Sequence, residues 1–212
     1  ASVGSWSQYR GEVSVGGALD AEKRLRSPPV AVASDQDFHY DRAHSRKGMA
    51  YGSLDYDLTP DTTLSLYGAH QNDKTNPFSG LPARSDGQFL DVPRSTNPYP
   101  SWALSDTTTS MAAAEAAHRW GSGWTLRGRY SFSAQGVDLR DGYPTTGVDV
   151  TTGSATYARR GWDTRAEHRV VDIHATGPFD WLGRNHHATV GWSHGRHTSS
   201  TDYGANDTVA GI

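Results

Sequence analysis

Four histidines in the C-terminal third of the chain have the residue type that could support metal binding. They lie close together in the sequence at His186, His187, His194 and His197. Imidazole is the commonest metal-binding side chain, but the ligands must converge on one point. Positions 194 and 197 are three apart, so they fall on opposite faces of a strand. We therefore interpret these histidines as polar strand and loop residues and predict no metal site.

Asp172 and His174, with serines nearby, have the residue types of a hydrolytic triad. A serine hydrolase also needs a nucleophile on a sharp turn and backbone donors for an oxyanion, and no sequence motif indicates either. Charged residues such as Glu115, Arg119 and Arg129 are interpreted as electrostatic and structural. The sequence therefore predicts a protein that is not an enzyme.

Aromatic residues in otherwise polar stretches are stronger candidates for a binding site. They are Phe78, Phe89, Tyr99, Trp102 and Tyr143. Aromatic rings supply a large contact area through few rotatable bonds, which suits the binding of a rigid ligand. Each ring could equally well pack within its own loop, so the residue types alone leave both roles open.

The elements around these residues alternate with period two, which is typical of β-strands. In the segment 125–132, Leu126, Tyr130 and Phe132 alternate with Arg127 and Arg129. The segments 50–58, 111–120 and 171–176 alternate in the same way. Leu54, Tyr56 and Ile173 belong to the apolar face, and Glu115 and Asp172 belong to the charged face. An arginine facing lipid at mid-bilayer costs about 2–4 kcal/mol. We therefore predict one face toward lipid and the charged face toward a lumen.

Short turns alternate with long polar stretches along the chain. Turn residues occur at Gly16-Gly17 with Asp20, Thr59-Pro60-Asp61, Gly121-Ser122-Gly123 and Gly177-Pro178. The long polar stretches cover residues 38–45, 74–106, 136–149 and 199–212. Short turns at one rim and long loops at the other are typical of outer-membrane barrels. The predicted fold is all-β, an antiparallel meander that forms part of a transmembrane outer-membrane β-barrel.

Composition excludes several other classes of protein. The formal net charge of -3 is scattered and forms no basic stripe, so we predict no nucleic-acid partner. The chain has no cysteine, which excludes a disulfide framework. No apolar run reaches 18 residues, and the mean hydropathy is -0.68, so no transmembrane helix is predicted. Barrel strands remain compatible with these values, because half of their residues are polar.

Several sequence blocks resemble TonB-dependent ferric-siderophore receptors, in the order of that family. They lie at 4–13, 46–62, 93–102, 114–127 and 176–184. The resemblance implies that residues 1–212 are a partial barrel domain, from about the first strand to the ninth of about 22. The plug domain and the C-terminal strands are then expected to be absent. Pro28-Pro29 departs from the family pattern and predicts a bulge or a late strand start.

The resemblance also implies a function, namely transport of ferric siderophores across the bacterial outer membrane. The extracellular loops would bind the chelate through the five aromatic residues named above, with Trp102 favoured because its loop resembles one that closes over ligand. No cofactor is expected, since the siderophore itself carries the ferric iron. The expected partners are the ferric siderophore, outer-membrane lipid and the TonB complex, the last contacted through the absent N-terminal region.

Two alternatives to this reading remain at the level of sequence. A small closed barrel of eight strands could act as a passive pore or a structural anchor, and 212 residues suffice for it. Against it, the segment 207–212 is interpreted as loop rather than as a closing strand. A soluble β-sandwich that binds carbohydrate is the other alternative, although aliphatic and aromatic faces recur in strand after strand.

Overall fold

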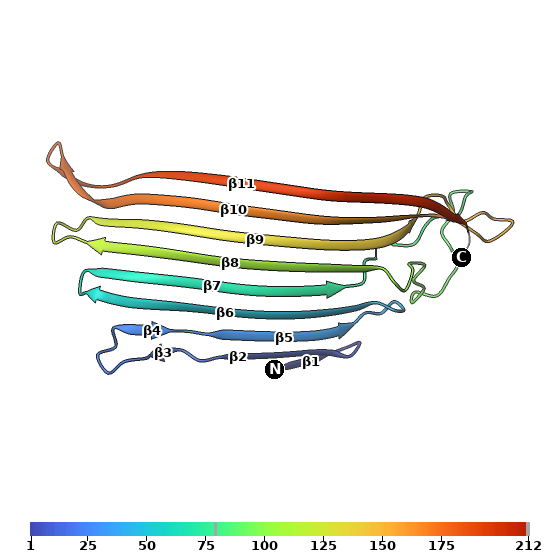
Figure 1. Ribbon diagram of the computed structural model, residues 1–212, viewed down its shortest axis with the longest axis horizontal. Coiled ribbons are helices and arrows are strands. Elements are labelled where there is room, and N and C mark those ends of the chain that lie inside the picture. Colours follow the sequence, from blue (N-terminus) through green and yellow to red (C-terminus); the bar gives the residue numbers. More distant parts are fainter. Residues whose placement is uncertain (79, 211–212) are drawn as a thin grey trace.

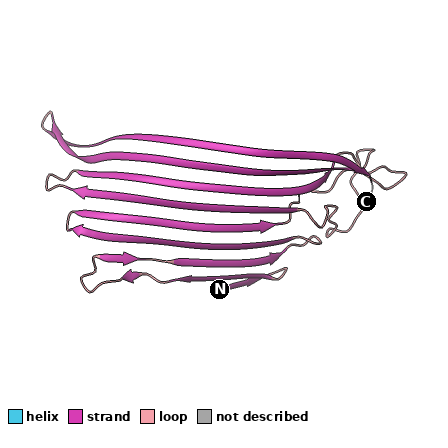
Figure 2. Ribbon diagram, in the orientation of Figure 1, coloured by secondary structure: helices cyan, strands magenta, loops and turns pink. Residues whose placement is uncertain are grey.

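The computed structural model describes residues 1–78 and 80–210. Their strands form a single antiparallel sheet (Figure 1). Its strands are β1 (Ser2–Gly4), β2 (Gln8–Ser14), β3 (Gly17–Ala18), β4 (Leu25–Ser27), β5 (Val30–Asp37), β6 (His44–Thr59), β7 (Thr62–Thr75), β8 (Leu104–Arg119), β9 (Thr125–Pro144), β10 (Thr156–Trp181) and β11 (Arg184–Ala210). Within the described residues no helix is long and apolar enough to cross a membrane (Figure 2).

The strands follow one another across the sheet in the order of the chain. The path runs β1-β2-β5-β6-β7-β8-β9-β10-β11, with β3 paired to β4 and β4 to β6. Every pair is antiparallel, which confirms the predicted meander. Pro28-Pro29 separates β4 from β5, as its missing backbone donors predict. Among the described residues β1 does not pair with β11, so these strands form neither a closed small barrel nor a two-layered sandwich.

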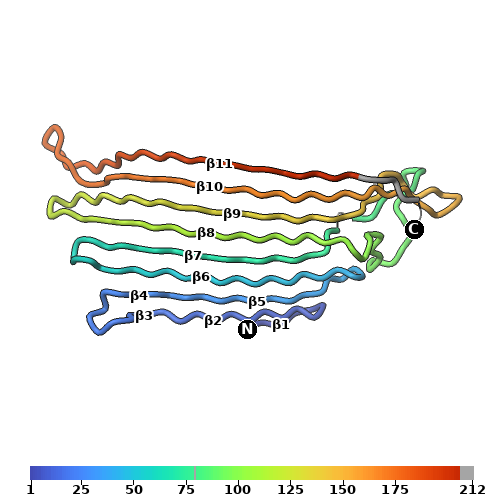
Figure 3. The backbone as a smooth tube through the Cα atoms, viewed as in Figure 1, coloured from blue at the N-terminus to red at the C-terminus, as the bar shows by residue number. Residues whose placement is uncertain are grey.

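Short turns and long loops lie at opposite ends of the sheet (Figure 3). At one end residues 60–61, 120–124 and 182–183 connect neighbouring strands. At the other end the connections are 38–43, 76–103 and 145–155. This arrangement confirms that the turn around Pro60-Asp61 and the long aromatic loop belong to different rims.

Two of the predicted turns are misplaced. Gly177-Pro178 lies inside β10, and the turn comes later, at Leu182 and Gly183, where φ is 52° and 73°. Two successive positive φ values are typical of a tight hairpin turn. Pro178 is tolerated because β9 begins at Thr125, opposite Thr176, so this end of β10 has β11 as its one neighbour. The first turn covers residues 19–24, so it includes the predicted Asp20, whereas Gly16-Gly17 precedes it and Gly17 belongs to β3.

Two polar stretches predicted as loops are largely strand. The stretch 136–149 was expected to be a loop, but β9 continues to Pro144. The stretch 199–212 was also expected to be a loop, yet β11 continues to Ala210, and residues 211–212 lie outside the described part. In 136–141 the alternation is reversed, with Asp138 and Arg140 on the convex face and Val137 and Leu139 on the concave one, and 199–202 is polar on both faces. Backbone pairing with β10 holds them in the sheet instead.

The register confirms the predicted separation of the two faces, because directly opposed residues share a face. Glu115 opposes Arg129, which opposes Asp172. On the other face Leu54 opposes Leu66, Leu66 opposes Ala114, and Ala114 opposes Tyr130. Ile173 opposes Gly128, which lies on the same face as Tyr130, two residues away on β9. Ser65 is 7% exposed whereas the adjacent Leu66 is 55% exposed. The polar face is therefore the shielded, concave one, and the apolar face is the convex one.

A small cluster of buried apolar side chains lies where the long loops meet the outer end of β10. Val148, Ala155 and Tyr157 form a buried cluster, and Leu90 packs against it. Residues 76–103 and 145–155 therefore fold against each other as a small compact unit. That unit positions the aromatic candidates described next.

Candidate functional site

A stack of aromatic rings joins two loops at the outer rim. Phe38 stacks on Tyr40 at 5.3 Å between ring centroids, and Tyr40 stacks on Phe78 at 4.3 Å. Phe78 then meets Tyr99 edge-on at 5.5 Å. The first two rings come from the loop 38–43 and the last two from the loop 76–103. Phe78 and Tyr99, two predicted site residues, are thus brought together.

Hydrogen bonds between the two loops and around Asn97 fix the position of Tyr99. The Asp41 amide donates to the Ser95 carbonyl at 2.7 Å, and the Asn97 side-chain amide donates to the Asp41 carbonyl at 2.7 Å. The Asn97 side-chain oxygen accepts a bond from the Tyr99 amide at 2.9 Å, and Arg42 donates to the Asn97 carbonyl. Tyr99 is 4% exposed, so its ring serves mainly to hold the two loops together.

A hollow of about 590 Å³ opens between the long loops and the ends of β9 and β10. Residues from 80–87 and 143–147 line it, together with Tyr99 and Arg160. Its volume is in the range of small-molecule sites. Of the five predicted aromatic residues, Tyr99 and Tyr143 line this hollow.

Arg160 is the charged residue of the hollow that is held most firmly. Its guanidinium donates two bonds to the carboxylate of Asp141, at 2.7 and 2.9 Å. The same group lies over the rings of Tyr143, at 4.2 Å, and Trp162, at 5.1 Å. Two parallel hydrogen bonds and two ring contacts fix a cation beside aromatic surface. Sequence reasoning missed Arg160, although the adjacent pair Arg159-Arg160 before a tryptophan could have indicated it.

Trp102 and Phe89 lie apart from the lining of the hollow. Trp102 is 45% exposed, and the Arg159 guanidinium lies 5.8 Å from its ring centroid. Pro100 and Trp102 pack closely against Gly142 of β9. A Cβ at that position would come within 3.0 Å of Pro100 and 3.4 Å of Trp102. Phe89 is 93% exposed and projects into solvent. The five predicted residues therefore occupy one rim but form no single pocket.

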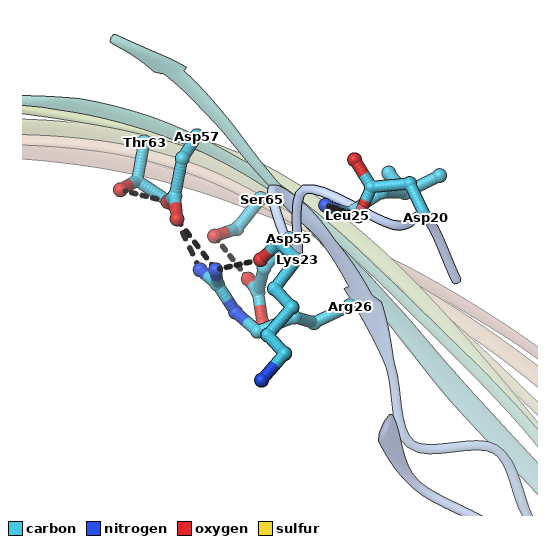
Figure 4. Close-up of polar contacts among 8 residues, drawn as sticks. All are labelled: Asp20, Lys23, Leu25, Arg26, Asp55, Asp57, Thr63 and Ser65. Atoms are coloured by element: carbon cyan, nitrogen blue, oxygen red, sulfur yellow. Dashed lines mark hydrogen bonds and ion pairs between the residues drawn. The ribbon is translucent and has the colours of Figure 1, made fainter. Parts of the chain in front are cut away.

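A polar network on the concave face lies near the opposite rim, close to the turn at residues 60–61. Figure 4 shows its members on β4, β6 and β7. Arg26 on β4 donates to Asp57 on β6, with Nη2–Oδ1 at 2.9 Å, and the Thr63 hydroxyl of β7 donates to the same carboxylate at 2.9 Å. Beside it Ser65 donates to Asp55. These contacts link β4 to the continuous strands β6 and β7, and we assign them a structural role.

The fold defines the class of protein. One antiparallel meander has an apolar convex face, a charged concave face, short turns at one rim and long loops at the other, which are the features of an outer-membrane β-barrel. No family model matches the chain. Curated relatives and solved structures do match it, and in both sequence and fold the chain matches the barrel of TonB-dependent ferric-siderophore receptors. These relatives are receptors, not enzymes.

The particular relatives are pseudomonad receptors. The chain is 30% identical to the ferric-pyoverdine M114 receptor PbuA of Pseudomonas sp. strain M114 and to the ferripyoverdine receptor of Pseudomonas aeruginosa, over 90% of its length. It spans 23–24% of these relatives, about a quarter. The crystal structure of the outer-membrane ferripyoverdine receptor of Pseudomonas aeruginosa bound to ferripyoverdine superposes with a TM-score of 0.91 and 26% identity, over 98% of this chain and 29% of that one. The predicted outer-membrane location is confirmed.

Proposed function

We propose that this chain is part of a receptor that binds a ferric siderophore at the cell surface and imports it across the outer membrane. The observation that carries the proposal is the match, over nearly the whole chain, to ferripyoverdine receptors in both sequence and fold. The two-faced sheet supports it independently, because a charged lumen and an apolar exterior suit a transport barrel. Contact with TonB would belong to a part of the receptor outside this chain.

The outer-rim aromatic residues supply the proposed ligand contacts. The candidates remain Trp102, Tyr99, Phe78, Phe89 and Tyr143. Apart from the buried Tyr99, their rings offer rigid apolar surface in a polar setting, and Arg160 adds a fixed positive charge beside Tyr143. Iron would arrive already chelated, so the protein would provide surface for the chelate rather than ligands for the metal.

Replacing Trp102 in the whole receptor tests this site. In cells with no other receptor for the same siderophore, we expect Trp102→Ala to weaken binding of the ferric siderophore by about tenfold, as loss of an exposed aromatic contact does. Trp120→Ala is the matched control, because Trp120 is 43% exposed but lies at the opposite rim. It should leave affinity unchanged.

The outcomes separate the site from the fold. Unchanged affinity in Trp102→Ala would remove this residue from the site. Equal losses in both variants would indicate impaired assembly rather than a lost contact. No binding of ferric siderophores by the unaltered receptor would contradict the proposed function itself.

A further inference from the structure

The apolar stretch of β10 ends abruptly toward the outer rim. On the convex face Val171, Ile173, Ala175, Gly177 and Phe179 follow one another by the alternation of the strand. They span nine residues, and a tilted strand needs about 9–11 residues to cross the hydrocarbon core. The next convex-face position toward the outer rim is Arg169. It therefore lies where hydrocarbon gives way to head groups.

A second arginine occupies the same level on the next strand. Arg169 of β10 is directly opposite Arg196 of β11 in the register, so the two side chains share the convex face. Directly opposed residues have Cβ atoms about 4.5–5.5 Å apart, and like charges in that position are destabilising. An anion between or beside the two guanidinium groups would relieve this repulsion.

The protein supplies only part of that negative charge. Arg169 donates to Glu167 at 2.8 Å and lies over the ring of Phe132 at 5.7 Å. Arg196 makes no hydrogen bond or ion pair with any side chain that the structure describes. The one carboxylate beside the pair is thus already bonded to Arg169. One positive charge remains uncompensated at the outer-rim end of the apolar stretch.

We propose that Arg169 and Arg196 bind the phosphate group of an outer-leaflet lipid. Guanidinium groups form paired, charge-assisted hydrogen bonds with phosphate, and Arg169 has donors left after its bond to Glu167. Basic residues at the edge of an apolar membrane surface attract anionic head groups. The apolar positions from Val171 onward lie below them, where the acyl chains of the same lipid would pack. The proposal rests on the membrane placement in the proposed function.

The test uses the whole receptor, purified and reconstituted with either diphosphorylated lipid A or its dephosphorylated counterpart. Native mass spectrometry measures how much of each lipid the protein retains. We expect the unaltered receptor to prefer the phosphorylated lipid by about tenfold, as charge-assisted bonds to phosphate allow. The double variant Arg169→Gln/Arg196→Gln should lose this preference. Arg165→Gln is the matched control, because Arg165 lies on the same face farther outward and contacts Asp163 at 3.3 Å; it should keep the preference.

Three results would overturn the proposal. They are equal retention of both lipids by the unaltered receptor, an unchanged preference in the double variant, and displacement by an equal concentration of inorganic phosphate. Arg196→Lys guards against misfolding, since it keeps the charge but loses the paired donors and should reduce the preference only partly. Binding of the ferric siderophore, measured in parallel, should be unchanged in the double variant. A receptor that binds no siderophore but keeps the lipid preference would contradict the proposed function alone.

Discussion

Strand β10 passes through two regions whose convex faces differ in the residues that they present. In its inner part the convex face presents Val171 and Ile173, and in its outer part it presents Arg165 and Arg169. The backbone pairing is continuous through both parts. The difference therefore comes from the surroundings: lipid requires apolar residues on that face, whereas water beyond the bilayer does not.

The two regions are also stabilised in different ways. The inner part is held by ladder hydrogen bonds and by exclusion of the convex face from water. Ion pairs occur in both parts, but the outer part adds ring contacts between two loops and a small apolar cluster around Val148 and Tyr157. Substitutions should consequently have effects that depend on the region more than on the strand.

The largest effect is expected for a charge on the inner convex face. Ile173→Arg should destabilise the folded barrel by about 2–4 kcal/mol, because the arginine would face hydrocarbon. Reversible unfolding of the whole receptor from vesicles measures this. Arg165→Ile, on the same strand and face of the outer part, should change stability by no more than about 0.5 kcal/mol. Similar costs for the two variants would remove the distinction between the regions.

Loss of the Asp141 contact should have the next largest effect. Arg160→Gln leaves a carboxylate that is 2% exposed without its charged partner, which should cost about 1–3 kcal/mol of outer-region stability. Arg140→Gln is the control, because Arg140 contacts Asp138 in an exposed pair at 3.3 Å and should change nothing measurable. Protection of the amides around Tyr143 from hydrogen exchange reports both. Equal protection in the two variants would contradict a special role for Asp141.

The turn between β10 and β11 should respond less. Gly183 has φ of +73°, which an L side chain adopts only with strain, so Gly183→Ala should cost about 1 kcal/mol. Gly136→Ala, at a strand position with open space around the added Cβ, should not incur this strain. Urea unfolding of both variants makes the comparison. A stable Gly183→Ala receptor would show that the turn can change its conformation.

The smallest effect is expected on the loop 145–155 as the pH is lowered. The Asp149 carboxylate accepts bonds from the amides of Thr151 and Thr152, at 2.9 and 2.8 Å, and these bonds lower its pKa from 3.8. A lowered pKa means that the contribution of the carboxylate is present above pH 3.8 and is lost as the pH falls through the lowered value. Hydrogen exchange of the two amides, corrected for intrinsic pH dependence, should increase there. Asp149→Ala should show no such pH dependence.

The same contrast between the regions explains what the sequence could predict. Leu126 and Tyr130 alternate with Arg127 and Arg129 because one face meets lipid, so strand type, face and meander were all predictable for the inner part. Beyond the bilayer the convex face carries polar residues, so the lipid-facing pattern is lost, and residues 136–144 and 199–210 were wrongly expected to be loop. Pro178 was mistaken for a turn residue because its tolerance depends on where the neighbouring strand begins.

The binding rim was predictable in location but not in detail. Aromatic residues in a long polar loop indicated the correct end of the sheet. The contacts of Tyr40 with Phe78 and of Arg160 with Asp141 join residues 38 and 19 positions apart, and such pairings follow from strand register and loop packing. Local sequence signals do not determine them.

A spin-label scan of β10 tests the division into two regions most directly. This chain has no cysteine, so single cysteines can be placed in it one at a time on the convex face. With the receptor in vesicles, labels at Val171, Ile173 and Ala175 should be accessible to oxygen and shielded from a water-soluble nickel chelate. Labels at Arg165 and Arg169 should show the opposite preference. Equal access of the nickel chelate along the whole convex face would contradict the placement of this sheet in the membrane.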